Sequence, residues 1–140
     1  MSKVFIDTAR GQIELEVYPD LMPITVANFD KLVQSGFYDG LKFHRVEDWV
    51  IQGGDPIGNG TGGPGWKIKL ETSPQLKNVR GAVAMARASD PNSAGSQFYI
   101  LKKDASWLDG QYAVFGKVVQ GLDVVDLIQK GDLMKTVKAE

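Results

Sequence analysis

The sequence Ile-Glu-Leu-Glu-Val at residues 13–17 alternates apolar and charged side chains at every position. This period of two predicts a strand with one buried face and one face in water. An apolar run at residues 4–6 precedes it, and Arg10-Gly11 between the two runs predicts a turn. The chain is therefore predicted to begin with two strands joined by that turn.

Two short helices are predicted on either side of a long β-rich region. Pro23 is placed to open the first helix, which carries an apolar stripe at helical spacing and stops at Gly36. The second is predicted at about residues 122–130, with Gly131 just beyond its end. Residues 37–121 consist of short β-like runs broken by glycine, proline, asparagine and aspartate. The fold class is thus mainly antiparallel β with two accessory helices.

Composition excludes several classes of chemistry. The 140 residues suit one domain, residues 1–140, and the absence of cysteine with a single histidine excludes thiol nucleophiles, disulfides and Cys/His zinc sites. The formal net charge of −1 provides no strong electrostatic attraction for nucleic acid or an anionic membrane. No signal-peptide pattern, membrane-spanning run or oligomerisation element is visible. We therefore expect a soluble, cytoplasmic monomer that binds neither nucleic acid nor membrane.

A glycine-rich stretch at residues 58–63 matches the dinucleotide pattern G-x-G-x-x-G. That pattern needs a following helix to hold the pyrophosphate, but Pro64-Gly65 comes next and residues 66–70 alternate like a strand. A structural or groove-lining loop is therefore favoured over a nucleotide site.

The stretch Phe43-His44-Arg45-Val46 carries the chain's only histidine. As a strand it would place Phe43 and Arg45 on one face and His44 and Val46 on the other. His44 is interpreted as structural rather than as a catalytic base, since no G-x-S-x-G motif accompanies it. Arg45 is either an ion-pairing surface residue or a fixed cation at the edge of an apolar pocket.

Residues 96–101 predict a strand with Gln97 and Tyr99 on one face and Phe98 and Ile100 in the core. Further along, Trp107 stands just before an Asp-Gly turn that leads into another predicted strand. This tryptophan either caps a core or offers a ligand a flat surface with an indole N–H donor.

Several motifs occur together in the order of one known family. They are Phe43-His-Arg45, Gln52-Gly-Gly-Asp55, Gly60-Thr-Gly-Gly63, Met85-Ala86, Gly95-Ser-Gln-Phe98, Trp107-Leu-Asp-Gly110 and Val114-Phe-Gly-Lys-Val118. Over roughly residues 3–130 the chain resembles the cyclophilins, the cyclosporin-binding family of peptidyl-prolyl cis-trans isomerases. The resemblance implies a closed eight-stranded antiparallel β-barrel with a helix capping each end and a groove on its outside. It implies no cofactor and no metal.

The resemblance also implies the site residues. Arg45 matches the catalytic arginine, and the matching substrate-binding positions are Trp49, Val50, Gln52, Ala86, Arg87, Gln97, Tyr99, Trp107, Leu108 and Tyr112. Four of these depart from the common family residue: Tyr99 and Trp49 replace phenylalanines, Tyr112 a histidine and Arg87 an asparagine. The link from Arg45 to Gln52 is one residue shorter than usual, and the hydroxyl of Tyr99 needs water or a partner.

The implied activity is rotation of Xaa-Pro bonds in peptides and unfolded proteins, which assists folding. Arg45 would stabilise the twisted prolyl amide, and Trp107 implies inhibition by cyclosporin. One alternative is a binding or chaperone module of the same fold that holds proline segments with little turnover. Another is a barrel that binds single-stranded nucleic acid on exposed aromatics, against which the net charge counts.

Overall fold

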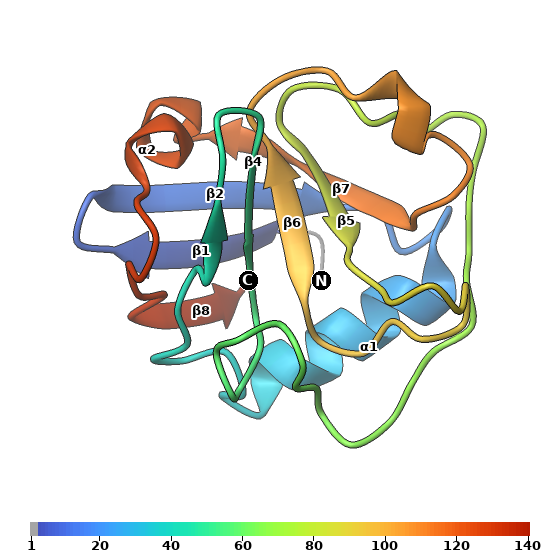
Figure 1. Ribbon diagram of the computed structural model, residues 1–140, viewed down its shortest axis with the longest axis horizontal. Helices are drawn as coiled ribbons and strands as arrows, with labels where there is room; N and C mark the ends of the chain where they lie inside the picture. The colour runs from blue at the N-terminus through green and yellow to red at the C-terminus, as the bar shows by residue number, and fades with distance from the viewer. Residues whose placement is uncertain (1–2) are drawn as a thin grey trace.

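One antiparallel sheet and two helices make up the computed structural model, which describes residues 3–140 (Figure 1). The strands are β1 (Lys3–Thr8), β2 (Gly11–Val17), β3 (Arg45–Val46), β4 (Val50–Gly53), β5 (Ala82–Met85), β6 (Phe98–Leu101), β7 (Val114–Gln120) and β8 (Thr136–Ala139). The helices are α1 (Pro23–Gln34), α2 (Leu122–Leu127) and a 3-10 turn, η1 (Ser106–Leu108). Spatially the strands run β3-β4-β6-β5-β7-β2-β1-β8, and each pairing is antiparallel. Within residues 3–140, no helix has the length and apolar character needed to cross a membrane.

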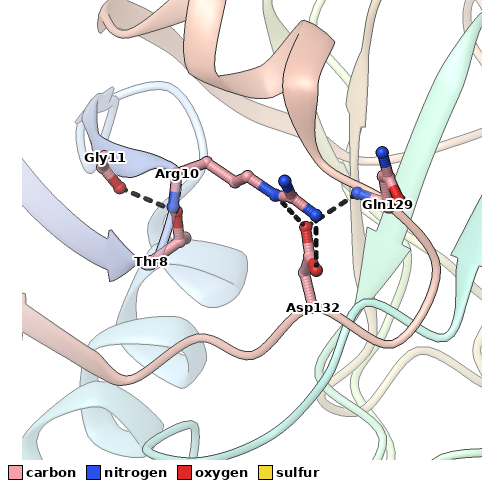
Figure 2. Close-up of polar contacts among 5 residues, drawn as sticks. All are labelled: Thr8, Arg10, Gly11, Gln129 and Asp132. Atoms are coloured by element: carbon pink, nitrogen blue, oxygen red, sulfur yellow. Dashed lines mark hydrogen bonds and ion pairs between the residues drawn. The ribbon is translucent and has the colours of Figure 1, made fainter.

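The predicted pair of N-terminal strands is confirmed as the β1–β2 hairpin. Ile6 lies opposite Ile13, and both are buried in the main core. The hydroxyl of Thr8 shapes the turn, because it donates to the carbonyl of Gly11 (2.8 Å) and accepts from the backbone N–H of Arg10 (3.0 Å; Figure 2). Strict alternation thus identified a strand whose apolar face is the one that is buried.

The sheet curls into a half-barrel, so the prediction of a closed barrel is wrong. β3 and β8 are the two ends of the strand order and do not pair with each other. The gap is bridged by irregular segments: the N–H of Phe43 donates to the carbonyl of Asp132 (2.8 Å), and that of Gly131 to the carbonyl of Phe43 (2.9 Å). A ladder does not form here because β3 has only two residues and Gly131 turns the chain with a φ of +93°.

An ion pair fastens this bridging segment to the β1–β2 turn (Figure 2). Nε of Arg10 donates to Oδ2 of Asp132 at 3.0 Å, and the same oxygen accepts from the backbone N–H of Gln129 (2.8 Å). The hydrogen bond from Arg10 lowers the pKa of the Asp132 carboxyl, and the Gln129 N–H adds to this effect. Residues far apart in sequence therefore hold the open side of the half-barrel together.

Helix α1 agrees with the prediction, whereas α2 is shorter than expected. α1 starts at Pro23 and buries Val26, Phe29 and Leu32. α2 ends at Leu127 rather than near residue 130, because the backbone of Ile128 is already extended (φ −59°, ψ 136°) and its side chain is buried. In Figure 1, α1 lies along the lower side of the sheet and α2 at the upper left.

Two local β predictions are also wrong. Residues 66–70 form no strand, since only Ile68 makes a single bridge, to Ala94. At residues 43–46 the strand begins only at Arg45, and Phe43 and Val46, rather than Phe43 and Arg45, both pack in the main core. Alternation counted through His44 assigned these faces wrongly, because the chain before Arg45 is not extended in a ladder.

Two apolar clusters lie on opposite faces of β6. Phe98 and Ile100 belong to the main core, while Tyr99 and Leu101 belong to a smaller cluster with Val50. The predicted faces of this strand are confirmed. The smaller cluster is the foundation of the site described next.

Candidate active site

A cavity of about 280 Å³ opens over the smaller cluster, on the face of the sheet away from the main core. Its lining is Arg45, Trp49, Val50, Gln52, Ala86, Arg87, Tyr99, Leu108 and Tyr112, all of them predicted site residues. The remaining two, Gln97 and Trp107, lie beside it, since Gln97 bonds to Gln52 and Trp107 packs on Trp49. The fold thus brings together the residues predicted from four separate stretches of sequence, 45–52, 86–87, 97–99 and 107–112.

Arg45 lies at the edge of this cavity with its guanidinium held from two sides. Nε donates to Oε2 of Glu47 (2.5 Å), and Nη1 donates to Oε1 of Gln52 (3.1 Å), its neighbour across the β3–β4 pair. The Cζ atom also lies 5.4 Å from the ring centroid of Trp49. The side chain remains 43% exposed. Both interpretations of Arg45 therefore apply, because it is ion-paired and it is a fixed cation beside an apolar pocket.

A chain of amides connects Arg45 to the glycine-rich loop. Nε2 of Gln52 donates to Oε1 of Gln97 (3.1 Å), and Nε2 of Gln97 donates to the carbonyls of Gly60 (3.0 Å) and Gly62 (2.9 Å). No helix follows this loop, which agrees with the rejection of a nucleotide site. The loop instead orients the polar side of the cavity.

Asp55 organises that loop, a role that the motif alone did not reveal. Its carboxylate is 1% exposed and accepts backbone N–H bonds from Ile57 (2.8 Å), Asn59 (3.1 Å) and Gly60 (2.5 Å). Burial raises the pKa of this carboxyl, but the surrounding backbone N–H groups more than compensate and the net shift is downward. An aspartate followed closely by several glycines was the available signal in the sequence.

Tyr99 forms the floor of the cavity and its hydroxyl has a partner. The residue is 5% exposed, and its hydroxyl donates to Oδ1 of the buried Asn78 at 2.6 Å. Burial raises the pKa of Tyr99, so the phenol stays protonated. The ring packs edge-on against Tyr112 with centroids 6.0 Å apart. The departure from phenylalanine therefore leaves no unpaired hydroxyl.

The side chain of Arg87 is held by contacts with neighbouring residues of the chain. Its guanidinium lies 4.6 Å from the ring centroid of Tyr112 and donates to the carbonyls of Gln111 (3.0 Å) and Ala88 (2.9 Å). Among residues 3–140 it forms no ion pair with a carboxylate. It thus joins two loops at the border of the cavity.

Trp107 is 62% exposed, so it does not cap a core. It packs on Trp49 with ring centroids 5.6 Å apart and an interplanar angle of 57°. The two indoles form one aromatic rim beside Arg45. A ligand that covers the cavity would meet this rim.

The side chain of His44 does not line the cavity. Its Nδ1 atom is buried and has no hydrogen-bond partner among the described residues. Burial lowers the pKa of His44, and the neighbouring Arg45 adds to this, while Asp55 opposes it. This environment therefore disfavours the charged imidazolium form of His44.

A second hollow of about 800 Å³ adjoins the first and shares Gln52, Ala86 and Arg87 with it. The glycine-rich loop, residues 60–65, forms one wall, which confirms the groove-lining interpretation. The part of the chain that the structure describes contains no cluster of three or more potential metal ligands.

Comparison with known proteins agrees with this geometry. A family model described as cyclophilin type peptidyl-prolyl cis-trans isomerase/CLD matches residues 3–140. The chain is 49% identical over 133 residues to peptidyl-prolyl cis-trans isomerase B of Bacillus subtilis, covering 93% of this chain and 92% of that protein. It is 45% identical over 136 residues to a peptidyl-prolyl cis-trans isomerase of Helicobacter pylori, covering 94% and 83%.

Among solved structures, a cyclophilin type peptidyl-prolyl cis-trans isomerase of Cryptosporidium parvum, crystallised in the presence of the dipeptide Ala-Pro, superposes with a TM-score of 0.92. It is 32% identical, and the match covers 99% of this chain and 98% of that one. The sequence match and the fold lead to the same assignment. This chain belongs to the cyclophilin-type peptidyl-prolyl cis-trans isomerases.

Proposed function

We propose that this chain accelerates rotation about Xaa-Pro bonds in peptides and unfolded proteins by a non-covalent mechanism centred on Arg45. The observation that carries the proposal is a permanent cation, fixed by Glu47 and Gln52, at the edge of an apolar cavity of about 280 Å³. A cavity of this size suits a proline ring. Neither a cysteine nor a histidine base is needed for such a reaction.

Amide rotation is slow because the C–N bond loses its resonance in the twisted state, at a barrier of about 18 to 20 kcal/mol. In that state the prolyl nitrogen becomes pyramidal and gains a lone pair. The guanidinium of Arg45 can donate a hydrogen bond to this lone pair, which is absent in the planar ground state. The bond therefore stabilises the transition state more than the substrate.

The rest of the site holds the peptide for this step. Val50, Tyr99 and Leu108 would grip the proline ring, and Gln97 with nearby backbone groups would hold the flanking chain. Shortening a step of tens of seconds to about a millisecond needs a rate acceleration of roughly 10⁴ to 10⁵, or about 5 to 7 kcal/mol of transition-state stabilisation. One charge-assisted hydrogen bond, desolvation and orientation together reach this magnitude.

The test measures kcat/KM by exchange NMR on a proline-containing peptide. We expect Arg45→Ala to reduce kcat/KM by about 10² to 10³, and Arg45→Lys to recover little because an ammonium lacks the planar fork. Lys103→Ala is the control, since Lys103 is a basic residue paired with Asp48 outside both hollows. Full activity of Arg45→Ala would refute the mechanism.

The non-catalytic binding module is not favoured. That alternative relied on Tyr99 and the shortened link to spoil the pocket, yet the hydroxyl of Tyr99 bonds to Asn78 and the link still brings Trp49 and Val50 to the cavity. We also propose that cyclosporin inhibits the enzyme through the exposed indole of Trp107. Trp107→Ala should weaken that inhibition at least tenfold, and an unchanged inhibition constant would exclude this role.

A further inference from the structure

Asn78 is a buried polar residue that the mechanism does not use. It is 1% exposed and precedes β5, outside the lining of both hollows. Its backbone N–H and side-chain Nδ2 both donate to Oδ1 of Asp109 (2.7 and 3.1 Å). Its carbonyl accepts from the N–H of Ala105 (2.8 Å), and its Oδ1 accepts from the hydroxyl of Tyr99 (2.6 Å). Its backbone and side chain are therefore fully engaged.

The partners of Asn78 lie at the two ends of η1. Ala105 immediately precedes this short helix and Asp109 immediately follows it. Between them stand Trp107, on the rim, and Leu108, in the wall of the cavity. One buried residue thus holds both ends of the segment that presents these two residues, with its backbone carbonyl at Ala105 and with its backbone N–H and side-chain Nδ2 at Asp109.

The helix η1 depends on such a tether because it has little packing of its own. None of its three residues is buried, and Leu108 packs only partly against the smaller cluster. A three-residue 3-10 helix is also weak by itself. The hydrogen bonds to Asn78 run instead to a rigid part of the molecule, because Tyr99 lies within β6 in the middle of the sheet.

We propose that Asn78 is a positioning residue for the isomerase, which fixes the Leu108 wall of the proline pocket relative to its Tyr99 floor through the Tyr99 hydroxyl. The inference rests on the proposed site, in which the cavity over Tyr99 receives the proline ring. It gives the tyrosine at position 99 a purpose that a phenylalanine could not serve, since only the hydroxyl reaches Asn78.

The experiment is a double-mutant cycle with Asn78→Ala, Tyr99→Phe and the double variant. Steady-state kcat and KM for a proline-containing peptide are measured at a temperature where urea unfolding shows every variant to be folded. Val4→Ala is the control for lost stability, because Val4 is fully buried in β1 on the far part of the sheet.

A loosened wall should weaken substrate binding more than the chemical step. We expect Asn78→Ala to raise KM about tenfold and Tyr99→Phe about threefold, with kcat changed less than about threefold in each. The double variant should resemble Asn78→Ala, because both changes break the same link. The indole ¹H–¹⁵N resonance of Trp107 should shift in Asn78→Ala and Tyr99→Phe and stay in place in Val4→Ala.

Three results would overturn the proposal: an unchanged KM in both single variants, effects that multiply in the double variant, or an equal KM rise in Val4→Ala. Tyr99→Phe keeps the ring and removes only the hydroxyl, so it decides the matter even where Asn78→Ala does not fold. Failure of the Arg45 mechanism is distinguishable, since it appears as full activity of Arg45→Ala and leaves the effects on KM measurable.

Discussion

Replacing Asp55 by asparagine tests whether one buried carboxylate holds the glycine-rich loop. Oδ1 accepts from the N–H of Ile57, and Oδ2 accepts from those of Asn59 and Gly60. An asparagine has one acceptor oxygen, so in either orientation its NH₂ group faces at least one of these N–H donors. A hydrogen bond to a charged group contributes about 1.5 to 3 kcal/mol. Losing one and making the others neutral should therefore lower the free energy of unfolding by about 2 to 4 kcal/mol.

The difference in unfolding free energy between the wild type and Asp55→Asn should also depend on pH. The folded-state pKa of Asp55 is lowered, so its stabilising effect is present above the unfolded pKa of about 3.9 and is lost as the pH falls through the folded value. The gap between the wild type and Asp55→Asn should therefore be full at pH 7 and shrink below about pH 4. The Asp55→Asn variant lacks this carboxylate, so it does not lose this stabilising contribution as the pH falls.

Urea unfolding at a series of pH values measures both effects, with Asp20→Asn as the matched control because Asp20 is exposed. The same variant should lower kcat/KM, since the carbonyls of Gly60 and Gly62 hold Gln97. A loss below about 0.5 kcal/mol, as is usual for surface substitutions, would refute the role of Asp55. A stability difference between the wild type and Asp55→Asn that stays constant below pH 4 would also refute it.

Three further outcomes are expected from the same structure. Gln52→Ala should reduce kcat/KM about tenfold in the isomerase assay, because Arg45 keeps only its bond to Glu47; unchanged kinetics would count against that tether. Gly54→Ala should cost about 3 kcal/mol in urea unfolding, since φ is +90° and the new Cβ would lie 2.7 Å from the carbonyl of Ser96. Asp132→Asn should lower the unfolding midpoint at pH 7, and this loss should shrink as the pH falls below about 4, because Arg10 holds the pKa of that carboxyl below its usual value; a loss that stays constant as the pH falls would contradict the ion pair as its cause.

Prediction from the sequence was most accurate where the alternation of side chains within one strand determines which face is buried. β2 and β6 alternate within a single ladder, so counting by two placed Ile13, Phe98 and Tyr99 on the correct faces. The site residues were predicted from motif order, and most of them line one cavity. The strand faces depend on patterns within a few neighbouring residues, whereas the site positions were inferred from the order of motifs along the chain.

The prediction was wrong where the outcome depends on segments distant in sequence. Closure of the sheet was decided by how residues 40–43 meet residues 131–134, which no local pattern encodes. Residues 66–70 alternate but find only one bridge, to Ala94, so they form no strand. Asn78 was overlooked for the same reason, because its partners Tyr99 and Asp109 lie 21 and 31 positions away.

The site is built on two side-chain hydrogen-bonded networks that lie next to each other where Gln52 of β4 is paired with Tyr99 of β6. One is polar and runs from Asp55 through the glycine-rich loop to Gln97, Gln52 and Arg45. The other lies beneath the apolar pocket and runs from Tyr99 through Asn78 to both ends of η1. No side-chain hydrogen bond is shared between the two networks, but the β4–β6 pairing and the packing of Trp49 on Trp107 join them. The tyrosine at position 99 is accommodated because its hydroxyl bonds to Asn78 beneath the cavity, on the side away from the Arg45–Gln52 bond.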